Sequence, residues 1–320
     1  MISILAKSSS DKSIKYVLGN KTGNKFEAVY FKFFEEEDKN RPYFNYYLED
    51  GQLPTYTICI SSQIGCAMGC TFCATGYGGF FKNISAEELL EQVFLIRNDL
   101  IKEKIEKVES LGNIILMGMG EPLMNLPNVL KFCRKLNTIS TNFIKLKSIS
   151  TIGIVPKIKE LAHVLDINIK LFLSLHSPFD EERSSLMPIN LKYNIQEIIA
   201  ACEYFAHIQQ QKIIVCYLLL KGINDSEKHA QAFSELLNPQ FFETQILSYN
   251  PIPNVDFERP SIKTAFSFAQ IIKEKGLTTD IRISKGQDIQ GGCGQLVQED
   301  TGKTIKKRDI VKCALPLSLP

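Results

Sequence analysis

The sequence has no long hydrophobic run, little net charge and no tandem repeat, and each absence narrows the class of protein. The apolar run Ile2–Ala6 ends at Lys7 and a serine cluster, which is too short for a secretory signal or a membrane span. The formal charge of +2 is too small to indicate nucleic-acid binding by itself, and it does not exclude it. Nine cysteines without a secretion signal indicate a reducing compartment. We therefore expect a cytoplasmic protein with no membrane segment.

Three of the cysteines, Cys66, Cys70 and Cys73, lie on one short stretch with the spacing C-x₃-C-x₂-C. Three thiolates at this spacing can bind three irons of a [4Fe–4S] cluster and leave the fourth iron open to a substrate. The stretch, with Phe72 before the last cysteine, resembles the motif of radical S-adenosylmethionine (SAM) enzymes. Zinc is the competing metal, but it needs a fourth protein ligand, and no Cys or His follows at zinc-ribbon spacing.

Strand-like and helix-like segments alternate from about residue 57 onward, which predicts a parallel sheet in an α/β fold. The chain length suits one large α/β domain. Six units and a closing strand fit a partial (β/α)₆ barrel, related to the (β/α)₈ TIM barrel. The expected strands are Thr57–Ser61, Asn113–Met117, Lys145–Ser150, Ile169–Leu175, Lys212–Leu220, Thr244–Tyr249 and Thr278–Ser284. The expected helices are Ala86–Ile101, Pro127–Leu136, Pro156–His163, Ile195–His207, Glu227–Leu237 and Lys263–Lys275.

The segments outside the barrel are interpreted separately. Ser13–Leu18 and Phe26–Tyr30 predict a small β extension, followed by an aromatic and acidic insertion at about 31–54. The insertion is read as a long hairpin with a solvated acidic tip, and a partner-binding flap is the alternative. We expect a division into an N-terminal β module (1–54), a radical SAM barrel carrying a C-terminal cysteine loop (55–300) and a tail (301–320).

Polar and glycine-rich residues follow the expected strands, so they should meet at one end of the barrel. A glycine-rich turn with Gly118, Gly120 and Glu121 follows the second strand, and its carboxylate suits an ammonium group. His176 at the end of the fourth strand is either a cofactor contact or a structural histidine. The other candidates for binding the carboxylate, ribose or adenine of SAM are Ser150, Ser174 and Asn250.

Two further cysteines, Cys59 and Cys293, are candidates for sulfur chemistry. Cys293 lies between glycines on a flexible loop, where a thiol can move and react. Cys59 lies on the first barrel strand, where it is either a small apolar core residue or a second reactive thiol. If the barrel closes, the two thiols can meet, one carrying a group and the other releasing it.

The motifs together resemble the RlmN/Cfr family of radical SAM RNA adenine methyltransferases. The resemblance covers roughly residues 13–30 and 55–300. It rests on Ser61–Cys66 and the cysteine loop, Met117–Leu123, Ser150-Thr151, Ser174–His176, Pro188–Asn190, Tyr249–Pro251 and Cys293–Leu296, which occur in this order.

The resemblance implies a methyl-cysteine mechanism that consumes two SAM molecules per turnover. Cys293 accepts a methyl group from the first, and the second, bound at the Cys66, Cys70 and Cys73 cluster, is cleaved to a 5′-deoxyadenosyl radical. The radical removes a hydrogen atom from the methyl group on Cys293, and the resulting carbon radical adds to an adenine ring carbon. Carbon 2 is the expected target, and carbon 8 is the alternative within the family. Cys59 then resolves the adduct through a Cys59–Cys293 disulfide, and Glu27 is the implied general base.

The resemblance also implies cofactor contacts and partners. RNA, either ribosomal or transfer RNA, is the implied substrate, and flavodoxin or ferredoxin is the implied electron donor to a monomeric enzyme. The implied SAM contacts are Gly120, Glu121, Ser150, Ser174, Leu175, His176 and Asn250.

The sequence departs from the family pattern in three places, and these departures leave alternatives open. Only about thirty residues precede the insertion, which we expect to be too few for the N-terminal helical domain usual in the family. The 31–54 insertion is additional, and Lys285-Gly286 replaces Arg-Gly before the reactive cysteine. Lysine keeps the charge but loses bidentate phosphate recognition. The alternatives are therefore the same mechanism on a peptide or small metabolite, and a redox sensor that binds cluster and SAM without turnover.

Overall fold

The computed structural model describes residues 1–32, 56–107, 110, 112–139, 144–282 and 284–297. The tail and nearly all of the 31–54 insertion lie outside these residues, so the hairpin and flap readings of the insertion stay predictions. The proposed boundaries at 54 and 300 also lie outside them. Within the described residues, no helix has both the length and the hydrophobicity that a membrane crossing requires.

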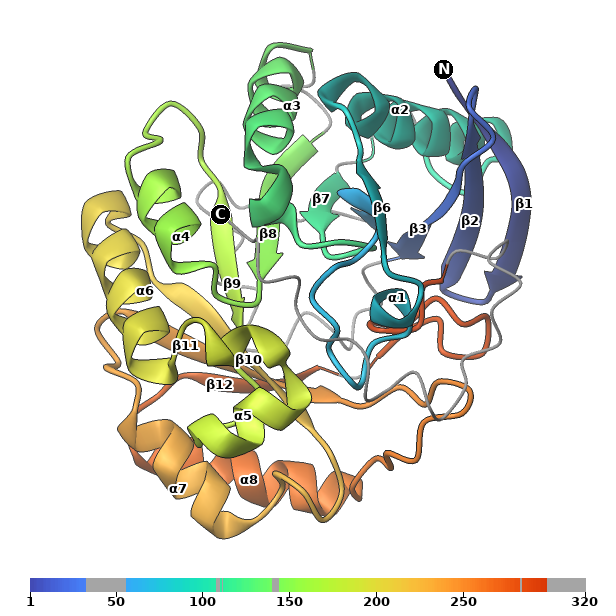
Figure 1. Ribbon diagram of the computed structural model, residues 1–320. Coiled ribbons are helices and arrows are strands. Elements are labelled where there is room, and N and C mark those ends of the chain that lie inside the picture. Colours follow the sequence, from blue (N-terminus) through green and yellow to red (C-terminus); the bar gives the residue numbers. More distant parts are fainter. Residues whose placement is uncertain (33–55, 108–109, 111, 140–143, 283, 298–320) are drawn as a thin grey trace.

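Ten strands form one curved sheet, and seven neighbouring strands of it are parallel (Figure 1). The two ends of the sheet, β1 and β12, are not paired with each other, so the barrel is open. This confirms the predicted partial barrel of six β/α units closed by a last strand. The parallel strands are β4 (Tyr56–Cys59), β7 (Gly112–Leu116), β8 (Ile144–Thr151), β9 (Lys170–Ser174), β10 (Ile213–Leu219), β11 (Phe242–Ser248) and β12 (Thr279–Arg282).

Six helices cover the outer face of the parallel strands (Figure 1). Capping boxes explain where two of them begin: Ser85 and Glu88 satisfy each other's backbone N–H at the start of α2, and Asn194 and Glu197 do so at α6. All six lie within a few residues of the predicted positions. They are α2 (Ala86–Lys102), α3 (Leu126–Ile139), α4 (Val155–Ala162), α6 (Ile195–Gln209), α7 (Glu227–Glu235) and α8 (Ile262–Glu274).

The N-terminal strands β1 (Ile2–Ser10), β2 (Ser13–Asn20) and β3 (Lys25–Lys32) are antiparallel and extend the barrel sheet. β3 pairs with β4 and places Val29 opposite Cys59. The structure therefore adds the small β extension directly to the first barrel strand. β1 was not predicted, because it is an exposed edge strand whose polar residues lack clear alternation.

Short elements that the sequence did not predict surround the functional loops. β5 (Gln63–Gly65) and β6 (Phe80–Asn83) form a small antiparallel sheet on either side of the cysteine loop, and α1 (Ala74–Tyr77) follows the last cluster cysteine. The helix α5 (Asp180–Leu186) follows β9, and the 3₁₀ helices η3 (Pro122–Asn125) and η4 (Pro188–Leu191) begin with proline. Each is too short to show a hydrophobic period.

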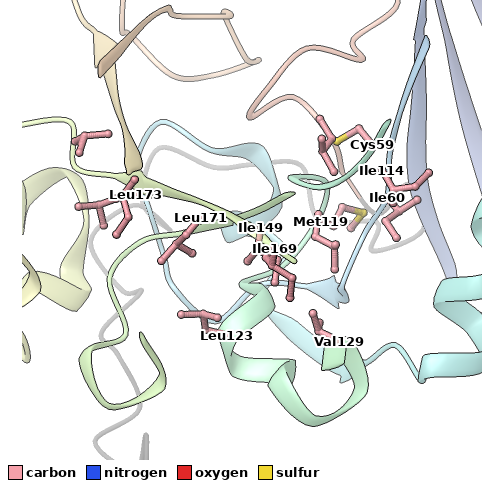
Figure 2. Close-up of a cluster of buried hydrophobic side chains, with 14 of the residues drawn as sticks. Cys59, Ile60, Ile114, Met119, Leu123, Val129, Ile149, Ile169, Leu171 and Leu173 are labelled. Carbon is pink, nitrogen blue, oxygen red and sulfur yellow. The ribbon is translucent and has the colours of Figure 1, made fainter. Parts of the chain in front are cut away.

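The core lies between the parallel strands and the helices that cover them. Leu123 of η3 and Val129 of α3 pack toward Ile149 of β8 and Leu171 of β9 (Figure 2). Cys59 lies at one end of this buried cluster, near Ile60 and Ile114 (Figure 2). The fold thus places Cys59 where a strand of the core reaches the end of the barrel that carries the candidate site.

Candidate active site

The cysteine loop joins β5 to α1 at the carboxyl end of the barrel strands. The N–H of Cys66 donates to the carbonyl of Gly79, which lies just before β6, at 2.9 Å, and the N–H of Cys73 donates to the carbonyl of Cys70 at 3.2 Å. Gly65 has φ +72°, and a side chain there would collide with the Gly79 carbonyl. The β5–β6 sheet therefore holds the two ends of the loop together.

The three thiols of the cysteine loop are buried and lie close enough for their charges to interact. Burial raises the pKa of Cys66, Cys70 and Cys73, and the negative charges of Cys66 and Cys73 raise the pKa of Cys70 further. Among the described residues, no three His, Cys, Asp or Glu side chains are close enough to chelate a single ion. Three thiols on one loop that interact through their charges are the donor set that a [4Fe–4S] cluster with one open iron requires.

The glycine-rich turn after β7 is tied to the end of β4. The N–H of Met119 donates to Ser61 Oγ at 2.8 Å, and the N–H of Ser62 donates to the Met119 carbonyl at 2.9 Å. Gly120 has φ +99°, and a Cβ there would lie 2.8 Å from the backbone nitrogen of Gln63. Glycine is required at this position because the turn combines a positive φ with close contact to the segment before the cysteine loop.

The turn presents the buried carboxylate of Glu121. Its two oxygens accept hydrogen bonds from the N–H groups of Leu123 and Ile152, both at 3.0 Å, which links the turn after β7 to the loop after β8. Burial raises the pKa of Glu121 to about 7 in spite of these bonds. A buried carboxylate at a barrel mouth suits an ammonium ligand, which restores the charge balance lost on burial.

Replacing Glu121 by Gln is expected to change how stability depends on pH. The pKa of Glu121 is raised on folding from 4.5 to about 7, so the native state binds more protons and loses stability as pH rises across this window. Relative to the original chain, Glu121→Gln should gain up to about 3 kcal/mol between pH 5 and pH 8. Urea unfolding of the metal-free proteins at both pH values measures this gain. If the difference in free energy of unfolding between the variant and the original chain were the same at both pH values, the raised pKa of Glu121 would be contradicted.

The ends of β8 and β9 bring the candidate serines together. Ser150 Oγ and Ser174 Oγ lie 3.4 Å apart, and both residues are half-buried. His176 follows with φ +62°. Burial lowers its pKa to about 3, and its Nδ1 accepts the N–H of Leu218 at 3.0 Å, so the ring is neutral and already engaged. Its edge-to-face contact with Phe72, at 5.1 Å between centroids, links it to the cysteine loop.

The loop that carries Cys293 is fixed by hydrogen bonds to two other segments, the end of β11 and the start of α1. Asn250 Nδ2 donates to the Cys293 carbonyl at 3.0 Å, and the N–H of Ala74 donates to the Gly294 carbonyl at 2.7 Å. Thr75 Oγ1 donates to the Leu296 carbonyl at 2.7 Å. The sequence predicted Asn250 as a SAM contact, and in the structure its amide holds the Cys293 loop.

One cavity brings the cluster loop and the two candidate reactive thiols together. Cys73, Cys59 and Cys293 all line it, along with Gly118 and Arg282. Cys293 is exposed and Cys59 is buried, and burial raises the pKa of Cys59 to about 12. The structure therefore places an accessible thiol and a protected thiol beside Cys73 of the cysteine loop.

Glu27 lies near this site but is held by two partners. Lys15 Nζ lies 3.0 Å from Glu27 Oε1, and the N–H of Val297, four residues after Cys293, donates to Glu27 Oε2 at 2.9 Å. Both members of the ion pair are almost fully buried. The carboxylate thus anchors the end of the Cys293 loop to β3.

Comparisons with known proteins decide the family. The radical SAM superfamily model matches residues 60–233. The chain is 39% identical over 295 residues to the dual-specificity RNA methyltransferase RlmN of Wolinella succinogenes, covering 90% of this chain and 78% of that protein. The RlmN of Campylobacter lari is also 39% identical, with coverages of 92% and 80%. The chain belongs to the RlmN family of radical SAM enzymes.

A solved structure supports the same assignment. A radical SAM methyltransferase from Sphaerobacter thermophilus has a TM-score of 0.80 and 34% identity, covering 92% of this chain and 81% of its own. The hydrogenase maturase HydG, at 13% identity and a TM-score of 0.52, shares the fold alone. As a radical SAM methyltransferase of the RlmN family, the protein uses a [4Fe–4S] cluster and SAM.

Sequence reasoning missed several residues that hold the RlmN-type site together. Thr75 and Gln295 fix the Cys293 loop, Gln295 Oε1 accepting the N–H of Gly292 at 3.0 Å and Gln295 Nε2 donating to the Pro251 carbonyl at 2.9 Å. Arg183 and Asn190 bridge the strand ends. The position of Thr75, two residues after a cluster cysteine, was a usable signal, whereas Arg183 shows none in the sequence.

Thr75→Val is expected to uncouple SAM cleavage from methyl transfer. Thr75 Oγ1 joins the cluster loop to the Leu296 carbonyl, so its loss leaves a buried carbonyl unpaired and frees the Cys293 loop. We expect about a tenfold rise in 5′-deoxyadenosine formed per methylated product. Thr75→Ser, which keeps the hydroxyl, is the matched control. Equal product ratios in the valine and serine variants would contradict this role.

Proposed function

We propose that the chain methylates carbon 2 of an adenine in ribosomal or transfer RNA, with Cys293 as methyl carrier and Cys59 as resolving thiol. The observation that carries the proposal is the single cavity lined by Cys59, Cys73 and Cys293. A radical is needed because carbon 2 of adenine is electron-poor and does not attack a sulfonium. When bound, the cluster and SAM supply a 5′-deoxyadenosyl radical.

The protein side chains divide this work. Cys66, Cys70 and Cys73 hold the cluster, and the backbone hydrogen bonds of Cys66 and Cys73 fix the loop that carries them. Glu121 accepts the ammonium of SAM, while the Gly120 backbone, Ser150, Ser174, Leu175, His176 and Asn250 surround the rest of the cofactor. Since His176 Nδ1 accepts the N–H of Leu218, Nε2 carries the proton of the neutral ring and is the ring atom that can donate to the cofactor.

The two thiols have different tasks because their exposure differs. The exposed Cys293 thiolate attacks the methyl carbon of a first SAM, which leaves as S-adenosylhomocysteine, so that the methyl group is on Cys293. The 5′-deoxyadenosyl radical supplied by a second SAM would then take a hydrogen atom from that methyl group. The resulting carbon radical on Cys293 adds to the adenine ring. Glu27, once it has separated from Lys15, removes the proton from the attacked ring carbon, and the cluster would take up the unpaired electron of the adduct. The buried Cys59 thiolate then attacks the Cys293 sulfur and breaks its bond to the new carbon, which takes up a proton and becomes the methyl group, and a Cys59–Cys293 disulfide remains.

The names of the relatives support RNA as the substrate class, because they are dual-specificity RNA methyltransferases. We further propose that the enzyme acts as a monomer and that flavodoxin or ferredoxin supplies its electrons. The cytoplasm is its proposed location, since a compartment that keeps thiols reduced is needed for both the cluster and the two reactive thiols.

Nucleoside analysis of treated RNA tests the proposal. Ribosomal and transfer RNA are incubated with the reconstituted enzyme, SAM and a reductant, digested and analysed by mass spectrometry, and 2-methyladenosine is the expected product. If 8-methyladenosine were found instead, the reaction would take place at carbon 8 of adenine. Methylated Cys293 without any methylated adenine would instead support a peptide or metabolite substrate. No 5′-deoxyadenosine at all would support the redox-sensor alternative.

A further inference from the structure

Arg183 of α5 is a buried arginine at the barrel mouth whose contacts are all to neutral groups. Its side chain is fully buried. Nε donates to the Leu175 carbonyl at 3.0 Å, and Nη2 donates to the carbonyls of Ile152 and Ser174 at 2.6 and 3.2 Å. Nη1 donates to Asn190 Oδ1 at 2.8 Å. Among the described residues, no carboxylate pairs with this guanidinium.

A buried charge without a paired carboxylate is costly, so its place in the fold calls for an explanation. Asp180 is near, but Asn190 stands between them: its Nδ2 donates to Asp180 Oδ1 at 2.8 Å while its Oδ1 accepts from Arg183. Asp180 is itself exposed to solvent. The sequence thus keeps an amide where a carboxylate would have neutralised Arg183 directly.

The helix that carries Arg183 contacts the cysteine loop. Arg183 lies three residues before Leu186, the residue of α5 that bonds to this loop. The N–H of Thr71 donates to the Leu186 carbonyl at 3.0 Å. Arg183 therefore connects the ends of β8 and β9, where SAM contacts are proposed, with the segment that carries Cys70.

We propose that Arg183 is a positioning residue that supplies an uncompensated positive charge to the cluster and so favours its reduced state. The inference rests on the proposed binding of the cluster by Cys66, Cys70 and Cys73. One-electron reduction adds a negative charge to an assembly that already carries three thiolates. A nearby positive charge in a buried, low-dielectric site stabilises this added electron.

Two variants test the unpaired charge of Arg183, one by deleting it and the other by pairing it with a carboxylate. Arg183→Met deletes the guanidinium. The double variant Asp180→Asn with Asn190→Asp keeps Arg183 and the number of charges, but moves the carboxylate onto the guanidinium, so it tests the charge even if the first variant does not fold. Arg97→Met is the control, since Arg97 is another buried arginine, on α2, beside Tyr56 at the start of β4.

The measurement is a redox titration of the reconstituted proteins with dithionite, followed by electron paramagnetic resonance of the reduced cluster. At the midpoint of the original chain, we expect the ratio of reduced to oxidised cluster to fall about tenfold in both test variants, a shift of about 59 mV for a one-electron couple. The ratio should stay within about twofold in Arg97→Met.

The outcomes separate this inference from the proposed function. If the variants that hold iron titrate like the original chain, the charge of Arg183 does not set the potential and the inference fails. A tenfold fall in Arg97→Met would also overturn it, because the effect would then not be specific to the cluster. If the original chain binds no cluster through its three cysteines, the proposed function fails first.

Discussion

Cys59→Ala is expected to stop after carbon–carbon bond formation and to accumulate a covalent adduct between Cys293 and RNA. The buried Cys59 and the exposed Cys293 line one cavity, so Cys59 is the thiol placed to release the product. Turnover should fall by about 10³-fold or more, since no other group replaces the attacking sulfur. Denaturing gel electrophoresis with labelled RNA detects the adduct, and sequencing of the trapped RNA identifies the target nucleotide.

Cys133→Ala is the matched control for this experiment. Cys133 is also fully buried, but it lies on α3 and lines no part of the cavity. It should turn over normally and trap no RNA. Normal turnover by Cys59→Ala would show that Cys59 is a packing residue, which is the simpler interpretation of a buried cysteine in a strand.

Replacing Cys70 by Ala is expected to abolish both iron binding and SAM cleavage. Two remaining thiols cannot hold a [4Fe–4S] cube that leaves one iron open, so 5′-deoxyadenosine formation should fall by about 10³-fold or more. Iron and sulfide analysis after anaerobic reconstitution measures cluster binding, and the amount of 5′-deoxyadenosine formed measures SAM cleavage. The same result is expected for Cys66 and Cys73.

Cys293→Ala is the control for Cys70→Ala, because each variant removes one thiol. It should keep its iron and cleave SAM, because Cys293 lies outside the cysteine loop, but it should transfer no methyl group to RNA. An iron content in Cys70→Ala equal to that of Cys293→Ala would contradict the assignment of the cluster ligands.

Much of the fold was predictable because its signals are local. The buried parallel strands are short apolar runs, and the helices between them carry caps and a hydrophobic period that the sequence shows directly. β1 and α5 were missed for a physical reason. β1 is held by backbone pairing with β2 along an exposed edge, and α5 by contacts of Arg183 with carbonyls of two other strand ends.

The sequence predicted which residues lie at the site end of the barrel, but it did not predict most of the hydrogen bonds between them. The alternation of strands and helices placed Asn250 and Cys293 at the same end of the barrel. It did not reveal that the Asn250 amide donates to the Cys293 carbonyl, 43 residues away, or that Lys15 holds Glu27. Such bonds depend on the three-dimensional approach of distant segments, which no local pattern encodes.

Labelling of Cys293 with SAM that carries a deuterated methyl group is the most direct test of the central claim. After incubation, tryptic digestion isolates Cys293 in the peptide Gly286–Lys303, separate from Cys59 and the cluster cysteines. The account predicts one deuterated methyl group on Cys293 and none on Cys59. A peptide without label, or label on Cys59 in its place, would show that Cys293 does not carry the methyl group.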